Sequence, residues 1–242
     1  MMHYSLIRDP FVSASLRTIL CSMSLLAILL TSGCSGNDSD QQPRPNILLI
    51  VADDLGYSDL GAFGGEISTP NLDQLAANNL QLTSMYAAPT CSPTRAMLMS
   101  GTDNHLVGLG TMGEALQPFQ RGKPGYEGYL NHQAHSIAQL LKDGGYSTSM
   151  VGKWHLGLEP EQGPDRRGFQ HSFSMLEGGA SHFKPAVLNP TKVEQVHYRE
   201  NGQTVELPED FYSTDFYTDK LITYLQRSRK AGQPFFAAEQ GQ

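Results

Sequence analysis

The apolar run from Asn46 to Val51 (NILLIV) constrains the fold more than any other stretch of this sequence. Its apolar residues are continuous rather than alternating, which is typical of a strand buried on both faces of a parallel sheet. Pro45 precedes the run, and the pair Asp53–Asp54 follows it. The run therefore predicts an α/β fold in which a buried strand ends at two carboxylates.

Helical and extended segments alternate along the rest of the chain, which implies a parallel sheet in one domain. Thr69 and Pro70 are typical of a helix start, with Leu72, Leu75 and Ala76 on one face. We expect helices at 68–79, 92–101, 135–145 and 213–230, strands at 146–153 and 233–238, and a surface loop at 108–128. Within 196–207, the pair Asn201–Gly202 predicts a type I′ hairpin.

In open α/β sheets, functional groups gather at the carboxyl ends of the strands. Asp53 and Asp54 occupy one such end, and two adjacent carboxylates can hold a hard divalent cation. A helix-capping aspartate beside a solvated one would give the same pair. Lys153 and His155 flank Trp154 at a second end, so on extended chain they would point to one side and could bind an anion. Two exposed loop residues are the alternative.

Cys91 stands just before a predicted helix, and Arg95 lies about one turn into it. Exposed helix amides and a guanidinium both favour negative charge at the cysteine position, either a thiolate or an anionic substrate group. Cys21 lies in an apolar N-terminal segment and Cys34 at its end, so no disulfide partner is expected for Cys91. A buried inert thiol is the alternative, which the Ser-Pro-Thr-Arg context disfavours.

Residues 1–33 have the layout of a secretory signal, with Arg17 before a short apolar run and small residues before Cys34. The run is shorter than the roughly 20 residues that a membrane span needs. Thr31–Cys34 resembles the lipobox of bacterial lipoproteins, except that Thr31 replaces the usual leucine. Cys34 would then be lipidated, with a plain cleaved signal as the alternative. Residues 34–45 read as a flexible tether, and we expect an exported protein, periplasmic or anchored to the outer membrane.

Three motifs in order resemble the formylglycine-dependent sulfatases. The sequence CSPTR at 91–95 fits the family's C-x-P-x-R core, 145–155 looks like its second motif, and 46–65 resembles its first strand and metal loop. Three further stretches are similar to the bacterial arylsulfatase branch, and they lie at 100–114, 122–131 and 178–183. The resemblance runs from about Pro45 to the last strand.

The resemblance implies an alkaline-phosphatase-like α/β fold with a mixed, mostly parallel sheet flanked by helices. It also implies a bound calcium ion and oxidation of Cys91 to Cα-formylglycine by a separate maturation enzyme. One hydroxyl of the hydrated aldehyde would attack sulfur, the alcohol or phenol would leave, and the hemiacetal would then expel sulfate. Asp53, Asp54 and modified Cys91 would ligate calcium, Arg95 would stabilise the diol, and Lys153 and His155 would bind the sulfate and assist at the hydroxyls.

A complete sulfatase of this kind is considerably longer and carries a further histidine, an Asp-Asn calcium pair, another lysine and a C-terminal subdomain. We therefore expect residues 46–242 to be a truncated N-terminal part of the catalytic domain, with weak calcium binding and little hydrolysis alone. Asp103–Asn104 resembles the calcium pair but matches a loop, so it is not counted as a ligand. The G-x-G-x-x-G match at 108–113 follows no strand and is not counted as a nucleotide site.

The net charge of −7 and the lack of a basic cluster argue against nucleic-acid binding. The expected function is hydrolysis of an aryl or carbohydrate sulfate ester. Two alternatives stay open: a phosphate or phosphonate ester hydrolase of the same superfamily, and an anchored protein that binds sulfated polymers without catalysis. Any contact with a membrane would come only through the N-terminal lipid.

Overall fold

The computed structural model describes residues 43–183 and 196–241, and Pro45–Gln242 forms one compact unit. The signal segment 1–33, Cys34 and most of the 34–45 tether lie outside the described residues, so the expectations for them stay predictions. A search of the described helices for one with the length and apolar character of a membrane span found none.

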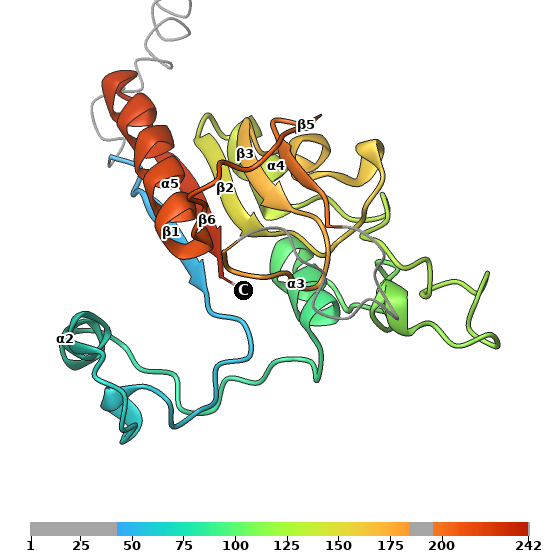
Figure 1. The fold of residues 1–242 in the computed structure, drawn as a ribbon, viewed down its shortest axis with the longest axis horizontal. Coiled ribbons are helices and arrows are strands. Elements are labelled where there is room, and N and C mark those ends of the chain that lie inside the picture. The colour runs from blue at the N-terminus through green and yellow to red at the C-terminus, as the bar shows by residue number, and fades with distance from the viewer. Residues whose placement is uncertain (1–42, 184–195, 242) are drawn as a thin grey trace, which may run out of the picture. The chain divides into compact units, whose positions relative to one another are not determined.

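Within the described residues, six strands form one sheet in the order β1-β6-β2-β3-β4-β5 (Figure 1). The strands are β1 (Ile47–Val51), β2 (Ser147–Lys153), β3 (His171–Met175), β4 (Tyr198–Glu200), β5 (Gln203–Thr204) and β6 (Phe235–Gln240). Strands β1, β6, β2 and β3 pair in parallel, whereas β4 and β5 are antiparallel. The mixed, mostly parallel sheet predicted from the sequence is confirmed.

All four predicted helices are present. They are α2 (Pro70–Asn78), α3 (Cys91–Ser100), α4 (Ile137–Asp143) and α5 (Ser213–Lys230). Short 3-10 turns lie elsewhere along the chain, at Gly61–Phe63, Gly113–Ala115, Pro160–Gln162 and Pro164–Arg167. Two helix ends carry clear local signals: the Ser136 side chain accepts a hydrogen bond from the Gln139 amide, and Gly101, with φ of 63°, ends α3. Thr69 precedes α2 as predicted, but its side chain makes no capping hydrogen bond. Helix α3 begins at Cys91, one residue earlier than predicted, because Pro93 fits within the first turn.

Strand β2 lies in the middle of the sheet, and all seven of its residues are buried. Its neighbouring residues Met150 and Val151 point into different apolar clusters. The Met150 cluster includes residues of α3 and α4, and the Val151 cluster includes Tyr217, Leu221 and Tyr224 of α5. Helices therefore flank the sheet on both faces, as the sequence predicted.

Strand β1 forms as predicted, but the expectation that it is buried on both faces is wrong. Ile47 and Leu49 pack against the core, whereas Leu48 is 50% and Ile50 60% exposed. The reason is that the described elements cover only the face that carries Ile47 and Leu49, and they leave the face of Leu48 and Ile50 open. β1 is also the sheet edge, and it pairs only with β6 within the described part of the chain. Likewise, Leu72 and Leu75 of α2 form one face but stay exposed.

The predicted hairpin is confirmed, because Asn201 (φ 50°) and Gly202 (φ 80°) are both left-handed and join the paired strands β4 and β5. Residues 108–128 form a loop apart from the turn Gly113–Ala115, as expected. The sequence reasoning missed β3, and it did not foresee that the last strand continues to Gln240.

Candidate active site

The parallel strands bring their carboxyl ends to one edge of the sheet. Asp53 follows β1, Lys153 ends β2 and Gln240 ends β6. Figure 1 shows α3 at this edge, and its first residue is Cys91. The motif residues that the sequence places at strand ends and at a helix start are therefore neighbours in space.

Asp53 is the central group of the site. Its Oδ2 forms an ion pair with Lys153 Nζ, and its Oδ1 accepts a hydrogen bond from Arg95 Nη2 at 3.3 Å. Burial by itself would raise the pKa of Asp53, but the hydrogen bond and charge of Lys153, aided by Arg95, outweigh it and lower the pKa. Asp53 is therefore a carboxylate that neutralises two almost fully buried cations.

Arg95 connects the helix to the sheet. Its Nη1 donates to the Lys153 carbonyl at 2.8 Å and to Gln240 Oε1, and its Nη2 donates to the Gly241 carbonyl at 3.2 Å. Burial lowers the pKa of Arg95 while the Asp53 charge raises it, and the guanidinium stays protonated. Gln240 is thus a site residue that the sequence reasoning missed.

Asp53, Asp54 and Cys91 each offer one potential ligand atom, and these atoms lie within 4.8 Å of one another. The Cys91 Sγ lies 3.9 Å from Asp53 Oδ2. Carboxylate oxygens suit calcium, whereas a thiol suits softer metals. The two aspartates therefore fit the expected ion, and residue 91 fits it only if oxygen replaces sulfur.

His155 lies at the same end of β2 but makes a different contact from Lys153. The simple alternation predicted for the two residues does not hold, because the strand ends at Lys153 and His155 has a left-handed φ of 54°. His155 Nε2 lies 3.0 Å from Glu114 Oε1, and Lys153 instead contacts Asp53. Burial raises the pKa of Glu114, but the hydrogen bond and charge of His155 lower it overall.

Glu114 is a second residue that the sequence reasoning missed, since only its membership of the stretch 100–114 was noted. His155 itself is 8% exposed, and its Nδ1 has no hydrogen-bond partner among the residues that the structure describes. A buried imidazole beside a carboxylate is suited to holding or moving a proton.

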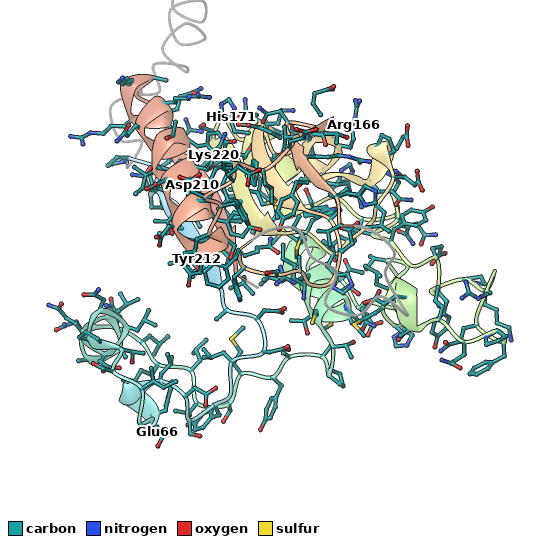
Figure 2. All side chains as sticks on the ribbon, viewed as in Figure 1. Glu66, Arg166, His171, Asp210, Tyr212 and Lys220 are labelled. Carbon is teal, nitrogen blue, oxygen red and sulfur yellow. The ribbon has the colours of Figure 1, made fainter. Side chains whose placement is uncertain are left out.

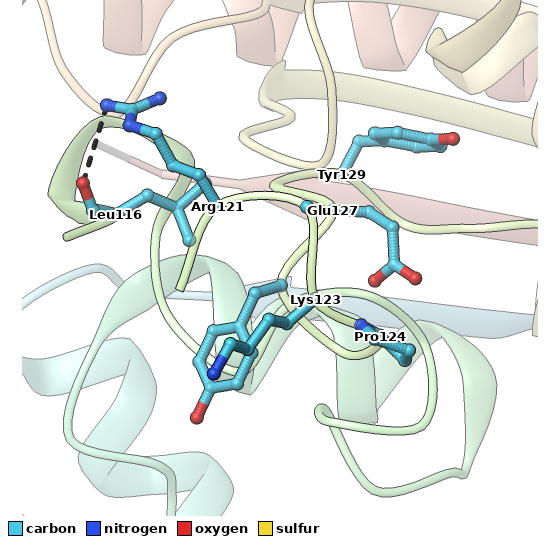
Figure 3. A pocket seen from close by; sticks show the side chains of 8 residues that line it. Leu116, Arg121, Lys123, Pro124, Glu127 and Tyr129 are labelled. Carbon is cyan, nitrogen blue, oxygen red and sulfur yellow. Dashed lines mark hydrogen bonds between the residues drawn. The ribbon is translucent and has the colours of Figure 1, made fainter. Parts of the chain in front are cut away.

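A cavity of about 420 Å³ is lined by Asp53, Asp54 and the loop 178–183. Gly178 allows this loop to approach the site closely, since a Cβ there would lie 2.6 Å from His155 Cε1. None of the predicted site residues lines a second cavity, of about 430 Å³, between Leu116 and Tyr129 (Figure 3).

The chain matches the family model described as Sulfatase over residues 45–238. An uncharacterised sulfatase of Schizosaccharomyces pombe is 45% identical over 210 residues, covering 83% of this chain and 38% of that protein. An arylsulfatase of Klebsiella aerogenes is 41% identical over 203 residues, covering 84% of this chain and 43% of that protein. The chain thus spans about two fifths of the length of these relatives.

Solved structures agree in fold. Ps i-CgsB in complex with k-i-k-neocarrahexaose has a TM-score of 0.68 at 30% identity, covering 82% of this chain and 45% of its own. BT4656 in complex with its substrate D-glucosamine-2-N,6-O-disulfate has a TM-score of 0.62 at 27% identity, covering 82% and 34%. These neighbours confirm the predicted fold. Because the family model matches most of the chain, the chain belongs to the sulfatase family.

Proposed function

We propose that this site hydrolyses an aryl or carbohydrate sulfate ester after Cys91 is oxidised to formylglycine by a separate maturation enzyme. The observation that carries the proposal is the grouping of Asp53, Asp54 and Cys91 beside the buried cations Lys153 and Arg95. Relatives described as an arylsulfatase and an N-acetylgalactosamine-6-sulfatase support the two substrate classes.

Asp53, Asp54 and an oxygen of modified residue 91 would hold calcium at this site. When bound, the ion supplies positive charge beside residue 91, where negative charge develops on the sulfate oxygens. Lys153 and Arg95 also contact the Asp53 carboxylate, at Oδ2 and Oδ1 respectively. They fix this carboxylate and add further positive charge.

In the proposed reaction, one hydroxyl of the residue 91 hydrate loses its proton and forms a bond to sulfur, and the bond from sulfur to the alcohol or phenol oxygen breaks. The departing oxygen takes up a proton. The second hydroxyl then loses its proton, the bond between the residue 91 carbon and the sulfate oxygen breaks, and sulfate leaves as the aldehyde re-forms. Water then hydrates the aldehyde again. Lys153 and His155 bind the sulfate oxygens, and His155, held by Glu114 at 3.0 Å, moves protons at the hydroxyls.

Mass spectrometry of the peptide that contains Cys91 tests the proposal directly. Protein purified from its native host should carry a residue about 18 Da lighter than cysteine, as expected for formylglycine. An unmodified thiol there would contradict the enzymatic proposal and favour a protein that only binds sulfated polymers. Faster turnover of phenyl phosphate than of phenyl sulfate by the modified protein would favour a phosphate ester hydrolase.

We also propose export with lipidation of Cys34, supported by the N-terminal sequence alone. Cell fractionation should find the wild-type chain in the membrane fraction and the Cys34→Ala variant outside it. Recovery of both forms in the soluble periplasmic fraction would favour the plain cleaved signal.

A further inference from the structure

We propose that His182, Phe183 and Tyr212 form the subsite that holds the organic ring attached to the sulfate group. The proposal rests on the proposed function, because it assigns the leaving-group side of the same cavity. We call these three residues the ring wall.

The position of the ring wall fits this role. His182 and Phe183 line the same cavity as Asp53 and Asp54. A ring that rests on Phe183 would therefore direct its sulfate toward the two carboxylates and residue 91. The cavity volume of about 420 Å³ lies within the range of small-ligand pockets.

The ring wall is anchored to the start of α5. His182 Nδ1 lies 2.7 Å from Ser213 Oγ, and the Ser213 amide donates to the His182 carbonyl at 2.8 Å. Ser213 is 2% exposed and is the first residue of α5. The two bonds fix the loop against a buried residue, so its aromatic rings are positioned before a ligand arrives.

The rings support one another. The Phe183 and Tyr212 ring centroids lie 5.2 Å apart, and those of His182 and Tyr212 lie 6.3 Å apart. Figure 2 shows Tyr212 beside the first turn of α5. Aromatic contacts at these separations are favourable, and they give the wall a continuous apolar surface.

The wall still has surface that a ligand can cover. Phe183 is 69% exposed, and Tyr212 is 39% exposed. His182 Nε2 has no hydrogen-bond partner among the residues that the structure describes. An aryl ring or the apolar face of a sugar would cover the exposed rings, and a hydroxyl of a sugar would pair with Nε2.

Calorimetric titration of the calcium-loaded chain tests this assignment, with Cys91→Ser, produced without the maturation enzyme, as the background so that an oxygen stays at residue 91 and no ester is cleaved. Benzenesulfonate represents an aryl ester, glucose 6-sulfate a carbohydrate ester, and methanesulfonate the same anion without a ring. We expect one or both ring compounds to bind about three- to tenfold more tightly than methanesulfonate. The compound with the larger preference identifies the ring class.

The double variant Phe183→Ala/Tyr212→Ala should lose this preference while methanesulfonate affinity stays unchanged. Phe119→Ala is the matched control, since Phe119 is 70% exposed and lines neither cavity. Thermal unfolding checks that both variants fold. Equal affinity for all three compounds, or a preference that survives in the double variant, would overturn the ring wall. An unmodified Cys91 thiol would instead overturn the proposed hydrolysis and leave the ring preference intact.

Discussion

Asp53 pairs with two buried cations, so the site tolerates loss of the Asp53 charge less than loss of any other charge among its described residues. The Asp53→Asn variant would leave Lys153 and Arg95 buried without their carboxylate. We expect this variant to lose about 3 kcal/mol of unfolding free energy, as for other broken buried ion pairs, and to lose calcium binding. Urea denaturation and calcium titration measure the two effects.

The matched control is Asp103→Asn, because the Asp103 side chain is 60% exposed and its ion-pair partner among the described residues is the similarly exposed His105. Its unfolding free energy should stay within about 0.5 kcal/mol of the wild type. Equal losses in the two variants would contradict the central role of Asp53.

The lowered pKa of Asp53 also makes stability depend on pH. The folded-state pKa lies below the ordinary value of 3.8, so this carboxylate binds protons more weakly in the folded than in the unfolded chain. Its stabilising contribution is complete above that ordinary value and is lost as the pH falls through the folded pKa. We expect the unfolding free energy to fall below pH 4, and to fall less steeply in Asp53→Asn. Urea denaturation at a series of pH values measures how steeply the unfolding free energy falls with pH in the wild type and in Asp53→Asn. Identical pH dependence in the two proteins would contradict the lowered pKa of Asp53.

Residues at the site differ in how well the sequence predicts them. Asp53, Cys91 and Lys153 belong to motifs at strand or helix ends, where topology alone brings side chains together. Glu114 and Gln240 carry no local signal, because their partners His155 and Arg95 lie 41 and 145 positions away in the sequence. Only tertiary packing brings these pairs together.

At the level of elements, helix boundaries were predicted well because caps, prolines and glycines act locally. Strand burial was predicted less well. The apolar run of β1 suggests burial on both faces, but burial depends on what packs over each face, and the described elements leave the face of Leu48 and Ile50 open. Strand β3 (HSFSM) lacks a strong apolar run, although four of its five residues are buried by neighbouring elements.

Gly152 is the residue on which the pairing of β2 with β6 depends most. Its φ is 96°, and a Cβ there would lie 2.1 Å from the Gln240 carbonyl oxygen, which is backbone and cannot move aside easily. We expect Gly152→Ala to lower the unfolding free energy by about 2–4 kcal/mol through backbone strain and overpacking. It should also displace Gln240 from Arg95 and weaken anion binding.

The control variant Gly232→Ala separates the cost of backbone strain from the cost of steric overlap with a neighbouring strand. Gly232 has a similar left-handed φ of 65°, but a Cβ there meets nothing within 4 Å. This variant should cost only about 1 kcal/mol and leave anion binding unchanged. Thermal unfolding and calorimetric titration compare the two variants, and equal costs would show that the close approach of β2 and β6 is unimportant.

At the level of the whole molecule, the site and the sheet edge lie on the same strand. β1 carries Asp53 at its carboxyl end, yet its outer side makes no strand pair within the described part of the chain. An unpaired edge with exposed apolar side chains is a template for pairing with another chain. The strand that carries the proposed metal ligands is therefore also the part of the described sheet that we expect to be most prone to association.

We expect this edge to make the purified chain self-associate, and lysine at the exposed positions to suppress it. Leu48→Lys and Ile50→Lys place charge where the side chains are 50% and 60% exposed, so neither substitution disturbs the core. Size-exclusion chromatography with light scattering should show a smaller associated fraction in the double variant. Leu49→Lys is the matched control, because Leu49 packs against the core, and it should lower the unfolding free energy without reducing association. If the associated fraction is the same in the double variant and the wild type, the β1 edge is not the surface through which the chains associate.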